Sequence, residues 1–432
     1  MGRKGGNKIV HVPRRFVRSE WGGTETVILE ISRRQKARGL EPVIMTSMAL
    51  ADRREEEIQG VPIRRFSYSY PFLGLSREEK AAMDKKGGNL LSLSLFLALL
   101  REPNVRLFHA HALKRLGGET RTAARLRSKP FVVSLHGGVF DVPAAEREAM
   151  EQPIRGKFEW GRAFGALFGS RRVLEDADLV ICVGQSELEK ASRELSHDRL
   201  AYLPNGVDTK RFARGEGSAF RKKHGVPEDA FLVLNISRID AQKNQLLLLR
   251  AFAEAVKEEP DLFLILAGPE TQPDYAAALR RFLAEQGLES RARILPGLPN
   301  DSPDLVNAYH ACDAFVLPSI HEPFGIVVLE AWSAGRPVIA SKVGGLKSLI
   351  AENETGWFID PTIPEAAGEL AELILRLRRE PHARNRLGEA GRLEALRRYD
   401  WDRIVDRLEA LYQQAERHAA ARGGNSKKSS EP

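Results

Sequence analysis

The chain has few cysteines and no long apolar segment. The two cysteines in 432 residues, Cys182 and Cys312, lie in short apolar runs, which indicates small core residues of a reducing compartment rather than a disulfide or a metal site. The longest apolar run, residues 90–100, is interrupted by Ser92 and Ser94 and falls short of the about 18 residues that a membrane span needs. The basic N-terminus is followed by a strand pattern, not a signal-peptide core. These shortages predict a cytoplasmic protein.

Acidic residues are also in deficit, with 58 Asp and Glu against 66 Lys and Arg and a net charge of +8. The basic residues are scattered, which favours a solvated basic surface; attraction to phosphates or to an anionic membrane surface is the functional alternative. No basic stripe alternates with stacking aromatic residues, so nucleic acid is not expected as a partner.

Short β-rich runs alternate with longer helical patterns over the whole chain. Near-continuous Val, Ile and Leu runs indicate strands buried on both faces of parallel sheets. The chain is too long for one core, and the pattern restarts after a turn-rich break at residues 204–208. The sequence therefore predicts an α/β protein with two doubly wound Rossmann-like domains, residues 1–206 and 207–399, and a disordered tail over 422–432. The predicted strands cover residues 8–13, 42–46, 61–66, 106–109, 131–135, 179–183, 200–203, 231–236, 262–267, 292–295, 314–317, 337–340 and 356–359.

The segment from His321 to Glu330 joins a predicted strand to a predicted helix. If the helix begins near Gly325, its unpaired N–H groups and its dipole form an anion site, and Glu330 lies roughly 7.5 Å along the axis. Glu322 precedes the first turn. One carboxylate could accept hydrogen bonds from a sugar and the other from a ribose, with a phosphate between them. Alternatively, Glu330 is a solvated helix residue and Glu322 an ordinary first-turn acid that the helix dipole favours.

Two cations, Arg238 and Lys243, follow the first predicted strand of the second half. Their loop opens a helix, so both can point toward the carboxyl edge of the sheet, where ligands of such sheets bind. A guanidinium fork and an ammonium would stabilise the negative charge that grows on a departing nucleoside diphosphate. The alternative is a pair of exposed loop cations.

Glycines and a histidine stand at the corresponding edge of the first half. Gly22 and Gly23 follow the first predicted strand and begin a helix, where backbone could approach a ligand closely. His136 ends a strand beside Gly137 and could reach a ligand hydroxyl or phosphate, with a buried structural histidine as the alternative. His109 and His111 end another strand and are weaker candidates.

In this order, Gly-Gly-x-Glu, the strand-end His-Gly, Pro-Asn-Gly-Val-Asp, the Arg and Lys loop and the two glutamates resemble the retaining family 4 glycosyltransferases of the GT-B fold. The resemblance extends from about residue 8 to residue 412. It implies a cleft between two Rossmann-like domains and a C-terminal helix, residues 400–418, that crosses back to the first, acceptor-side domain.

The resemblance also implies roles. It assigns Arg238 and Lys243 to the donor diphosphate, Glu330 to the ribose and Glu322 to the donor sugar. It assigns Phe324, Gly325 and Ile326 to backbone contacts with sugar and phosphate. It places His136 near the reacting face of the sugar, and Gly22 and Gly23 in a glycine loop over the phosphates. The implied enzyme is a hexosyltransferase-type, retaining glycosyltransferase of polysaccharide or glycoconjugate biosynthesis. It would move a sugar from a nucleoside-diphosphate-sugar substrate to a hydroxyl acceptor with no cofactor.

Metal independence is predicted as well. Asp400-Trp401-Asp402 matches the D-x-D pattern of metal-using sugar transferases, but an Asp directly before a helix is an N-cap. No other Asp, Glu or His cluster has ligand spacing.

Two polar stretches, residues 68–89 and 142–172, fit no specific acceptor. The second mixes cations with aromatics, which suggests either a helix packed at the cleft or peripheral membrane association. A sugar-nucleotide epimerase, a phosphorylase and a non-catalytic nucleotide-sugar-binding subunit are the alternative functions.

Overall fold

The structure, a computed structural model, describes residues 6–85, 87–137, 148 and 150–428, with side chains up to residue 422. It divides into two compact units. Unit 1 comprises Met1–Pro204 together with Ile404–Pro432, and unit 2 comprises Asn205–Arg403. The division falls close to the boundary expected from the turn-rich break in the sequence. The stretch at 142–172 lies partly outside the described residues.

Unit 1 is built on an eight-stranded sheet of order β3-β4-β2-β1-β5-β6-β7-β8. Adjacent strands of this sheet run parallel, apart from the antiparallel pair β3–β4. The edge strand β3 was not predicted, because its sequence Glu-Glu-Glu-Ile has no apolar alternation; charge of this kind protects an exposed edge. The strands are β1 (Lys8–Val12), β2 (Glu41–Ser47), β3 (Glu55–Ile58), β4 (Val61–Phe66), β5 (Val105–Ala110), β6 (Phe131–Leu135), β7 (Leu179–Cys182) and β8 (Leu200–Tyr202).

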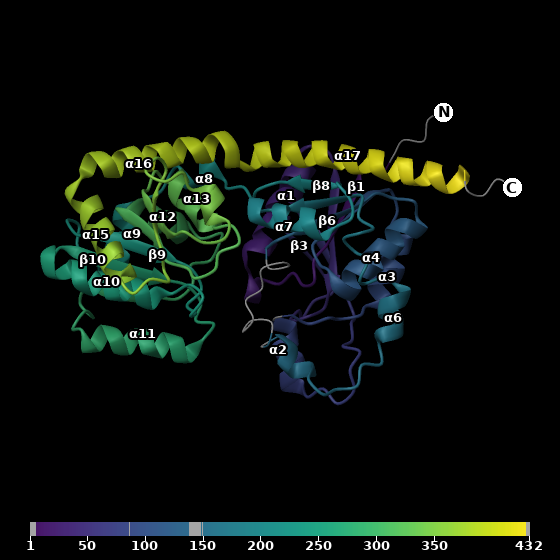
Figure 1. Cartoon of the computed structure of the whole chain (residues 1–432), viewed down its shortest axis with the longest axis horizontal. Coiled ribbons are helices and arrows are strands. Elements are labelled where there is room, and N and C mark those ends of the chain that lie inside the picture. The colour runs from purple at the N-terminus through teal and green to yellow at the C-terminus, as the bar shows by residue number, and fades with distance from the viewer. Residues whose placement is uncertain (1–5, 86, 138–147, 149, 429–432) are drawn as a thin grey trace. The chain divides into compact units, whose positions relative to one another are not determined.

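Helices and short helical turns connect these strands (Figure 1). They bury a continuous apolar core against the sheet, with Phe108 and Phe131 among its largest fully buried side chains. The elements are η1 (Arg18–Glu20), α1 (Gly23–Ala37), α2 (Arg77–Lys85), α3 (Leu93–Arg101), α4 (Lys114–Leu126), η2 (Gln152–Ile154), α6 (Arg162–Leu167) and α7 (Gln185–Glu194).

Unit 2 contains a parallel six-stranded sheet of order β11-β10-β9-β12-β13-β14. Each of its strands corresponds to a predicted one: β9 (Phe231–Ile236), β10 (Leu262–Ala267), β11 (Ala292–Leu295), β12 (Ala314–Leu317), β13 (Val338–Ser341) and β14 (Trp357–Ile359). The helices are α8 (Thr209–Phe212), α9 (Gly217–His224), α10 (Gln245–Glu258), α11 (Pro273–Glu285), α12 (Pro303–Ala311), α13 (Ile326–Ser333), α14 (Leu346–Leu349), α15 (Ala366–Arg379), α16 (Pro381–Glu394) and the π-helical turn η3 (Ala395–Tyr399).

A long C-terminal helix, α17 (Trp401–Lys428), begins in unit 2 and continues in unit 1. Asp400 caps it, since its carboxylate accepts the Asp402 N–H at 3.0 Å, which confirms the N-cap interpretation of Asp-x-Asp. The structure describes α17 as helical to Lys428, and the disordered tail from residue 422 stays a prediction. Residues 429–432 lie outside the described part of the chain.

The order of the strands fixes where each unit can bind a ligand. In unit 1 the chain order reverses between β1 and β5, and in unit 2 it reverses between β9 and β12. Ligands of open α/β sheets bind beyond the carboxyl ends of the strands at such reversals. The loops after β9 and β12 carry the predicted donor-site residues, and the ends of β1, β5 and β6 carry histidines.

Two expectations about the interior can be compared directly with the structure. Cys182 and Cys312 are buried free thiols, and burial raises the pKa of each to about 12, as expected for inert core residues. In the described part of the chain, no helix combines the length and the apolar character that crossing a bilayer requires.

Candidate functional site

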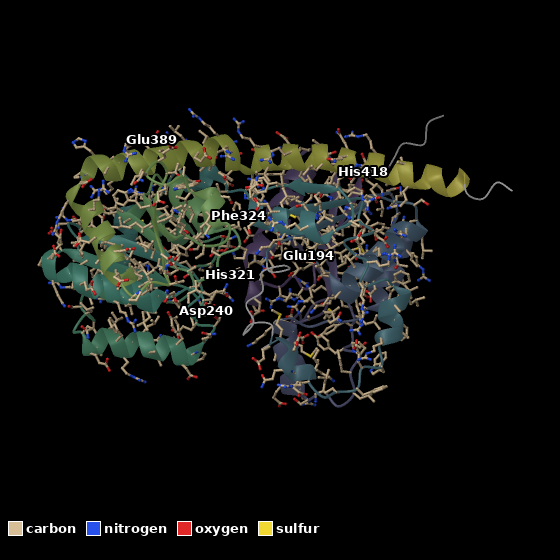
Figure 2. The ribbon with its side chains drawn as sticks, in the orientation of Figure 1. Glu194, Asp240, His321, Phe324, Glu389 and His418 are labelled. Carbon is tan, nitrogen blue, oxygen red and sulfur yellow. The ribbon has the colours of Figure 1, made fainter. Side chains whose placement is uncertain are left out.

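An ion pair joins the loops that follow the neighbouring strands β9 and β12. Lys243 Nζ donates to Glu322 Oε2 at 2.6 Å, and the two side chains are only 14% and 11% exposed. Gln242 ties the loops together a second time: its carbonyl accepts the Ile320 N–H at 2.8 Å, and its side-chain amide donates to the His321 carbonyl at 3.2 Å. Asp240 and His321 lie along one edge of unit 2 (Figure 2). These contacts hold the two predicted site residues, Lys243 and Glu322, in a fixed arrangement.

The loop after β9 also orients Arg238. Its Nη2 atom lies 3.1 Å from Asp240 Oδ2 and donates to Gln242 Oε1 at 3.4 Å, and the side chain is 44% exposed. Asp240 in turn accepts the backbone N–H of Lys243 at 3.1 Å. Arg238 therefore stands beside the Lys243 loop with a side chain that is partly open to solvent, in position to meet an anion.

The helix α13 begins where the sequence predicts. Gly325 is its N-cap, with a left-handed φ of 94°, and Ile326 is its first residue. A Cβ at Gly325 would come within 2.6 Å of Leu346, so both the conformation and the space require glycine. Phe324 is 5% exposed and packs edge-on against Tyr399, with ring centroids 6.4 Å apart. This packing fixes the direction in which the first N–H groups of the helix point.

A glycine pair after β13 supports this loop and was not predicted. Gly345 N–H donates to the Glu322 carbonyl at 2.9 Å. A Cβ on Gly344, whose φ is 48°, would lie 2.2 Å from that carbonyl, and a Cβ on Gly345 would lie 2.1 Å from the Pro323 carbonyl. The same signal that singled out Gly22 and Gly23, a glycine pair between a strand and a helix, could have identified this pair.

Glu330 lies on the buried side of α13. Its Oε2 accepts a 2.6 Å hydrogen bond from the Tyr309 hydroxyl, and the residue is 8% exposed. Burial raises the pKa of Glu330 to about 7, although the bond from Tyr309 and the charge of Arg211 act in the opposite direction. Glu330 can therefore change its charge near neutral pH. Tyr309, some 20 positions away, gave no signal in the sequence.

Charges in this part of unit 2 are balanced. Arg238 and Lys243 face Asp240 and Glu322, so the loops hold two cations and two acids. An ammonium has three N–H donors, and Glu322 takes one of those on Lys243. Arg238 meets both of its partners through Nη2. Both cations thus keep N–H groups that could donate hydrogen bonds to a diphosphate.

The predicted glycines of unit 1 form the exposed N-terminus of α1. Gly22 is the N-cap and Gly23 the first helical residue. The buried carboxylate of Glu25 accepts the Gly22 N–H at 3.1 Å and lies 4.0 Å from Arg15. Burial raises the pKa of Glu25. The glycine tip is therefore held by its own helix, with its backbone accessible.

His136 directly follows β6 and lies at one end of a row of histidines. Its Nε2 lies 2.8 Å from His111 Nδ1, and His111 Nε2 lies 3.0 Å from Nδ1 of the buried His11. Burial lowers the pKa of His136 to about 4, so the ring is neutral at physiological pH. His109, which pairs with His11 across β1 and β5, contacts the Tyr412 hydroxyl at 2.7 Å. His11 was not predicted as a site residue.

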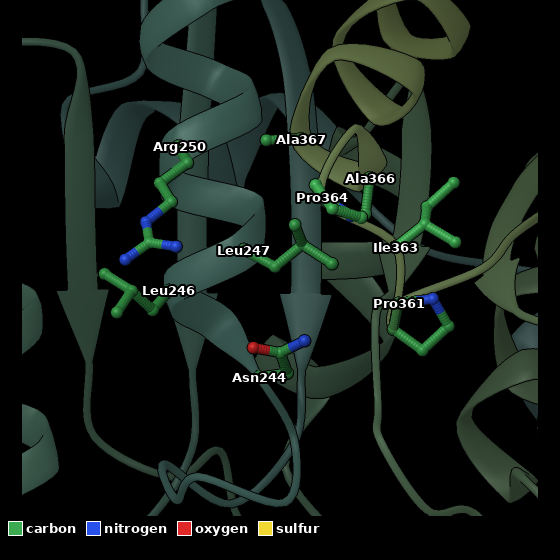
Figure 3. A pocket seen from close by; sticks show the side chains of 9 residues that line it. All are labelled: Asn244, Leu246, Leu247, Arg250, Pro361, Ile363, Pro364, Ala366 and Ala367. Atoms are coloured by element: carbon green, nitrogen blue, oxygen red, sulfur yellow. The ribbon is translucent and has the colours of Figure 1, made fainter.

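A pocket elsewhere in unit 2 contains none of the predicted residues. It lies between α10 and the segment that leads into α15 (Figure 3). Its walls are mainly apolar, and its polar side chains are those of Asn244 and Arg250. Asn244, which lines this pocket, immediately follows Lys243 and has a left-handed φ of 54°, so the pocket adjoins the end of the loop that carries the ion pair.

The two Rossmann-like units, the reversal-point loops and the shared C-terminal helix define a glycosyltransferase of the GT-B class. The family model "Glycosyltransferase Family 4" matches residues 21–211, and "Glycosyl transferases group 1" matches residues 218–394. A D-inositol 3-phosphate glycosyltransferase of Thermomonospora curvata is 32% identical over 421 residues, covering 90% of each chain. The chain therefore belongs to glycosyltransferase family 4, as the sequence motifs indicated.

Solved structures agree on the fold. A glycosyltransferase of Rickettsia africae superimposes with a TM-score of 0.71 at 18% identity, covering 95% of this chain and 98% of that one. Anabaena HepE, crystallised in complex with UDP, superimposes with a TM-score of 0.69 at 20% identity, covering 93% and 98%. These likenesses confirm the GT-B architecture.

Proposed function

We propose that this glycosyltransferase moves a sugar from a nucleoside-diphosphate-sugar to a hydroxyl acceptor, with retention at the anomeric carbon and without a metal ion. The observation that carries the proposal is the joined pair of loops after β9 and β12, in which Lys243, Glu322 and Arg238 stand beside the N-terminus of α13. The UDP bound to Anabaena HepE, a protein of the same fold, supports a nucleoside diphosphate as the leaving group.

Each residue has a role in this proposal. Arg238 and Lys243 donate to the diphosphate as its negative charge grows, and the N–H groups from Gly325 and Ile326 onward add the helix dipole. Glu322 orients Lys243 and accepts from the donor sugar. Glu330 accepts from the ribose. Because both cations keep N–H groups that can donate to the leaving group, the proposal assigns this task to them rather than to a divalent ion.

Unit 1 supplies the remaining groups. Gly22 and Gly23 offer accessible backbone at a helix N-terminus, and His136 is a neutral ring at the end of β6. In the proposal they contact the phosphates and the reacting face of the sugar, respectively. The relatives named for D-inositol 3-phosphate make that compound the first acceptor to test. A cytoplasmic location, to which the two buried free thiols are suited, belongs to the proposal.

The test is a transfer assay with UDP- and GDP-sugars, with and without D-inositol 3-phosphate, in EDTA. We expect nucleoside diphosphate release that depends on the acceptor, and NMR of the product should show the anomeric configuration of the donor. Lys243→Met should lower kcat by about 100-fold or more. Lys342→Met, which removes an exposed lysine from a surface pair with Glu352, is the matched control and should leave kcat unchanged.

Other outcomes would identify the alternatives. Turnover without an acceptor indicates an epimerase, and turnover with inorganic phosphate alone indicates a phosphorylase. Binding of UDP without turnover of any sugar indicates a binding subunit. Inversion of the anomeric configuration, or loss of activity in EDTA that added metal restores, would contradict the proposed mechanism.

A second proposal concerns the membrane surface. Leu73, Phe158 and Leu167 are 59%, 68% and 70% exposed, and Trp160 is 40% exposed. The backbones of Leu73 and Phe158 are hydrogen-bonded at 3.0 Å, and Arg162 nearby in sequence is 85% exposed. Large apolar side chains next to cations are typical of attachment to anionic bilayers. Co-sedimentation with anionic but not zwitterionic vesicles, lost in Phe158→Ser, would support it; equal recovery in the supernatant with both vesicles would refute it.

A further inference from the structure

Three histidines of unit 1 form one unbranched chain of hydrogen bonds. The chain runs from His136 Nε2 to His111 Nδ1 at 2.8 Å, and from His111 Nε2 to His11 Nδ1 at 3.0 Å. The planes of neighbouring rings are inclined by only 29° and 27°, with ring centroids 5.1 and 5.3 Å apart. Each contact joins two ring nitrogens, so one must donate and the other must accept. The protons on the three rings are therefore not independent.

The chain ends on an amide. Gln35, a buried residue of α1, places its Oε1 2.9 Å from His11 Nε2, and its Nε2 donates to the Tyr412 hydroxyl at 3.3 Å. A carbonyl oxygen can only accept, so His11 Nε2 must carry a proton. Burial lowers the pKa of His11 to about 4, and it lowers the pKa values of His111 and His136 as well. The rings are thus neutral, and each carries a single proton.

Counting protons from Gln35 outward fixes every tautomer. His11 has its proton on Nε2, so its Nδ1 accepts from His111 Nε2–H. His111 Nδ1 is then bare and accepts from His136 Nε2–H. We propose that Gln35, acting through His11 and His111, holds His136 in the Nε2–H tautomer and leaves its Nδ1 as an acceptor with a lone pair. Among the described residues, no hydrogen bond is recorded to that nitrogen.

The consequence is chemical. A bare Nδ1 can accept a hydrogen bond from a hydroxyl, but it cannot donate one to a phosphate or carbonyl oxygen. The inference rests on the proposed function in one respect: His136 then meets a hydroxyl of a sugar or acceptor rather than a phosphate oxygen. Gln35 is a positioning residue here, because it acts on His136 through two other rings.

A metal site is the competing interpretation of the same cluster. His11, His109 and His111 place one ring nitrogen each within 4.8 Å of one another. However, both nitrogens of His109 have partners, the Tyr412 hydroxyl at 2.7 Å and Ser134 Oγ at 2.7 Å, and an ion would have to displace the His11–His111 bond. Complete pairing of these nitrogens favours the relay over a metal.

The direct test is a long-range ¹H–¹⁵N spectrum of the full chain labelled with ¹⁵N-histidine, without substrate, with His136 assigned from a His136→Gln sample. We expect a pyrrole-type Nε2 and a pyridine-type Nδ1 for His136. The opposite tautomer, which a reversed Gln35 amide would impose on the whole chain, overturns the proposal. Stoichiometric zinc in the purified protein, by elemental analysis, overturns it as well.

Variants separate the relay from general packing. Gln35→Met removes the anchor and should convert the His136 signals to a mixture of tautomers. Ser134→Ala breaks a buried bond to His109 outside the chain and should leave the His136 tautomer as in the wild type. An unchanged tautomer in Gln35→Met, or an equal change in Ser134→Ala, refutes the relay.

Activity gives an independent result. In the transfer assay, Gln35→Met should lower kcat by at least about tenfold with little change in KM, whereas Ser134→Ala should not. If the tautomer changes and kcat does not, the role in the reaction is refuted. If the expected tautomer is found but no transferase activity exists, the proposed function fails and the proton arrangement stands.

Discussion

Breaking the Lys243–Glu322 pair should destabilise the protein in a way that a second substitution repairs. In Lys243→Met, the Glu322 carboxylate keeps its charge but loses its partner. Removing one member of a fully buried pair costs about 3–5 kcal/mol, and exposed pairs contribute about 0–1 kcal/mol. With side chains 14% and 11% exposed, this pair lies between these limits, and we expect a loss of about 1–3 kcal/mol.

In Lys243→Met/Glu322→Gln the stranded charge is gone. The double variant should therefore be more stable than the sum of the single effects by about 1–2 kcal/mol. Thermal unfolding of the full chain gives the values, since about 2–4 °C corresponds to 1 kcal/mol for a unit of this size. The same cycle on Lys342 and Glu352, 57% and 38% exposed, is the control and should show coupling below about 1 kcal/mol. Equal coupling in the two cycles would refute the reasoning.

Two further predictions concern the residues that support the site. Gly344→Ala should lower the melting temperature and weaken UDP binding, measured by calorimetry, because the added Cβ would lie 2.2 Å from the Glu322 carbonyl oxygen. Gly335→Ala is the control: Gly335 has a φ of 71° and its added Cβ would meet nothing within 4 Å, so this variant should lose only about 1 kcal/mol of stability and bind UDP as the wild type does. Acid should destabilise unit 1: the folded pKa of His11 is lowered from 6.5 to about 4, so this stability is present above pH 6.5 and is lost as pH falls toward 4. The protection factors of the amides in β1 and β5, which correct for the pH dependence of intrinsic exchange, should fall over that window, and less so in His11→Gln; an equal fall in both proteins would contradict the assignment.

Local patterns were sufficient to predict most of the fold. Runs of Val, Ile and Leu indicate buried strands, and the alternation of these strands with helices predicts parallel sheets. The strand β3 was missed because it contributes little apolar surface and shows no alternation. Its conformation depends on pairing with β4, which the local sequence does not specify.

The candidate site was predictable by position but not by contact. Arg238, Lys243 and Glu322 each follow a strand, and this alone brings them to one edge of a parallel sheet. That Lys243 bonds to Glu322, 79 positions away, requires β9 and β12 to be neighbours, which no local pattern specifies. The histidine chain depends in the same way on Gln35 of α1 and Tyr412 of α17, 377 positions apart.

The raised pKa of Glu330 makes its proposed role in ribose binding testable by pH. The ionised carboxylate accepts hydrogen bonds from two ribose hydroxyls better than the protonated acid does, since the acid turns one oxygen into a donor. Burial raises the pKa of the unliganded Glu330 to about 7. If only the ionised form binds well, UDP affinity should be nearly maximal at pH 8 and about tenfold weaker at pH 6, because roughly nine-tenths of Glu330 is then protonated. The phosphate of UDP also titrates, so the measurement is the difference between wild type and Glu330→Gln, in which this component is absent.

The same shift makes an opposite prediction for the unliganded protein. A carboxyl whose folded pKa is raised from 4.5 to about 7 favours folding below pH 4.5, and this contribution is lost as pH rises through 7. Glu330→Gln, which keeps an acceptor for Tyr309, should therefore gain about 3 kcal/mol over wild type on going from pH 4.5 to pH 8. If Glu330→Gln binds UDP more weakly at pH 8 but has a higher melting temperature there, the ionised Glu330 lowers the stability of the unliganded protein and strengthens UDP binding. Parallel pH profiles for the two proteins, in both melting and binding, would remove Glu330 from the site.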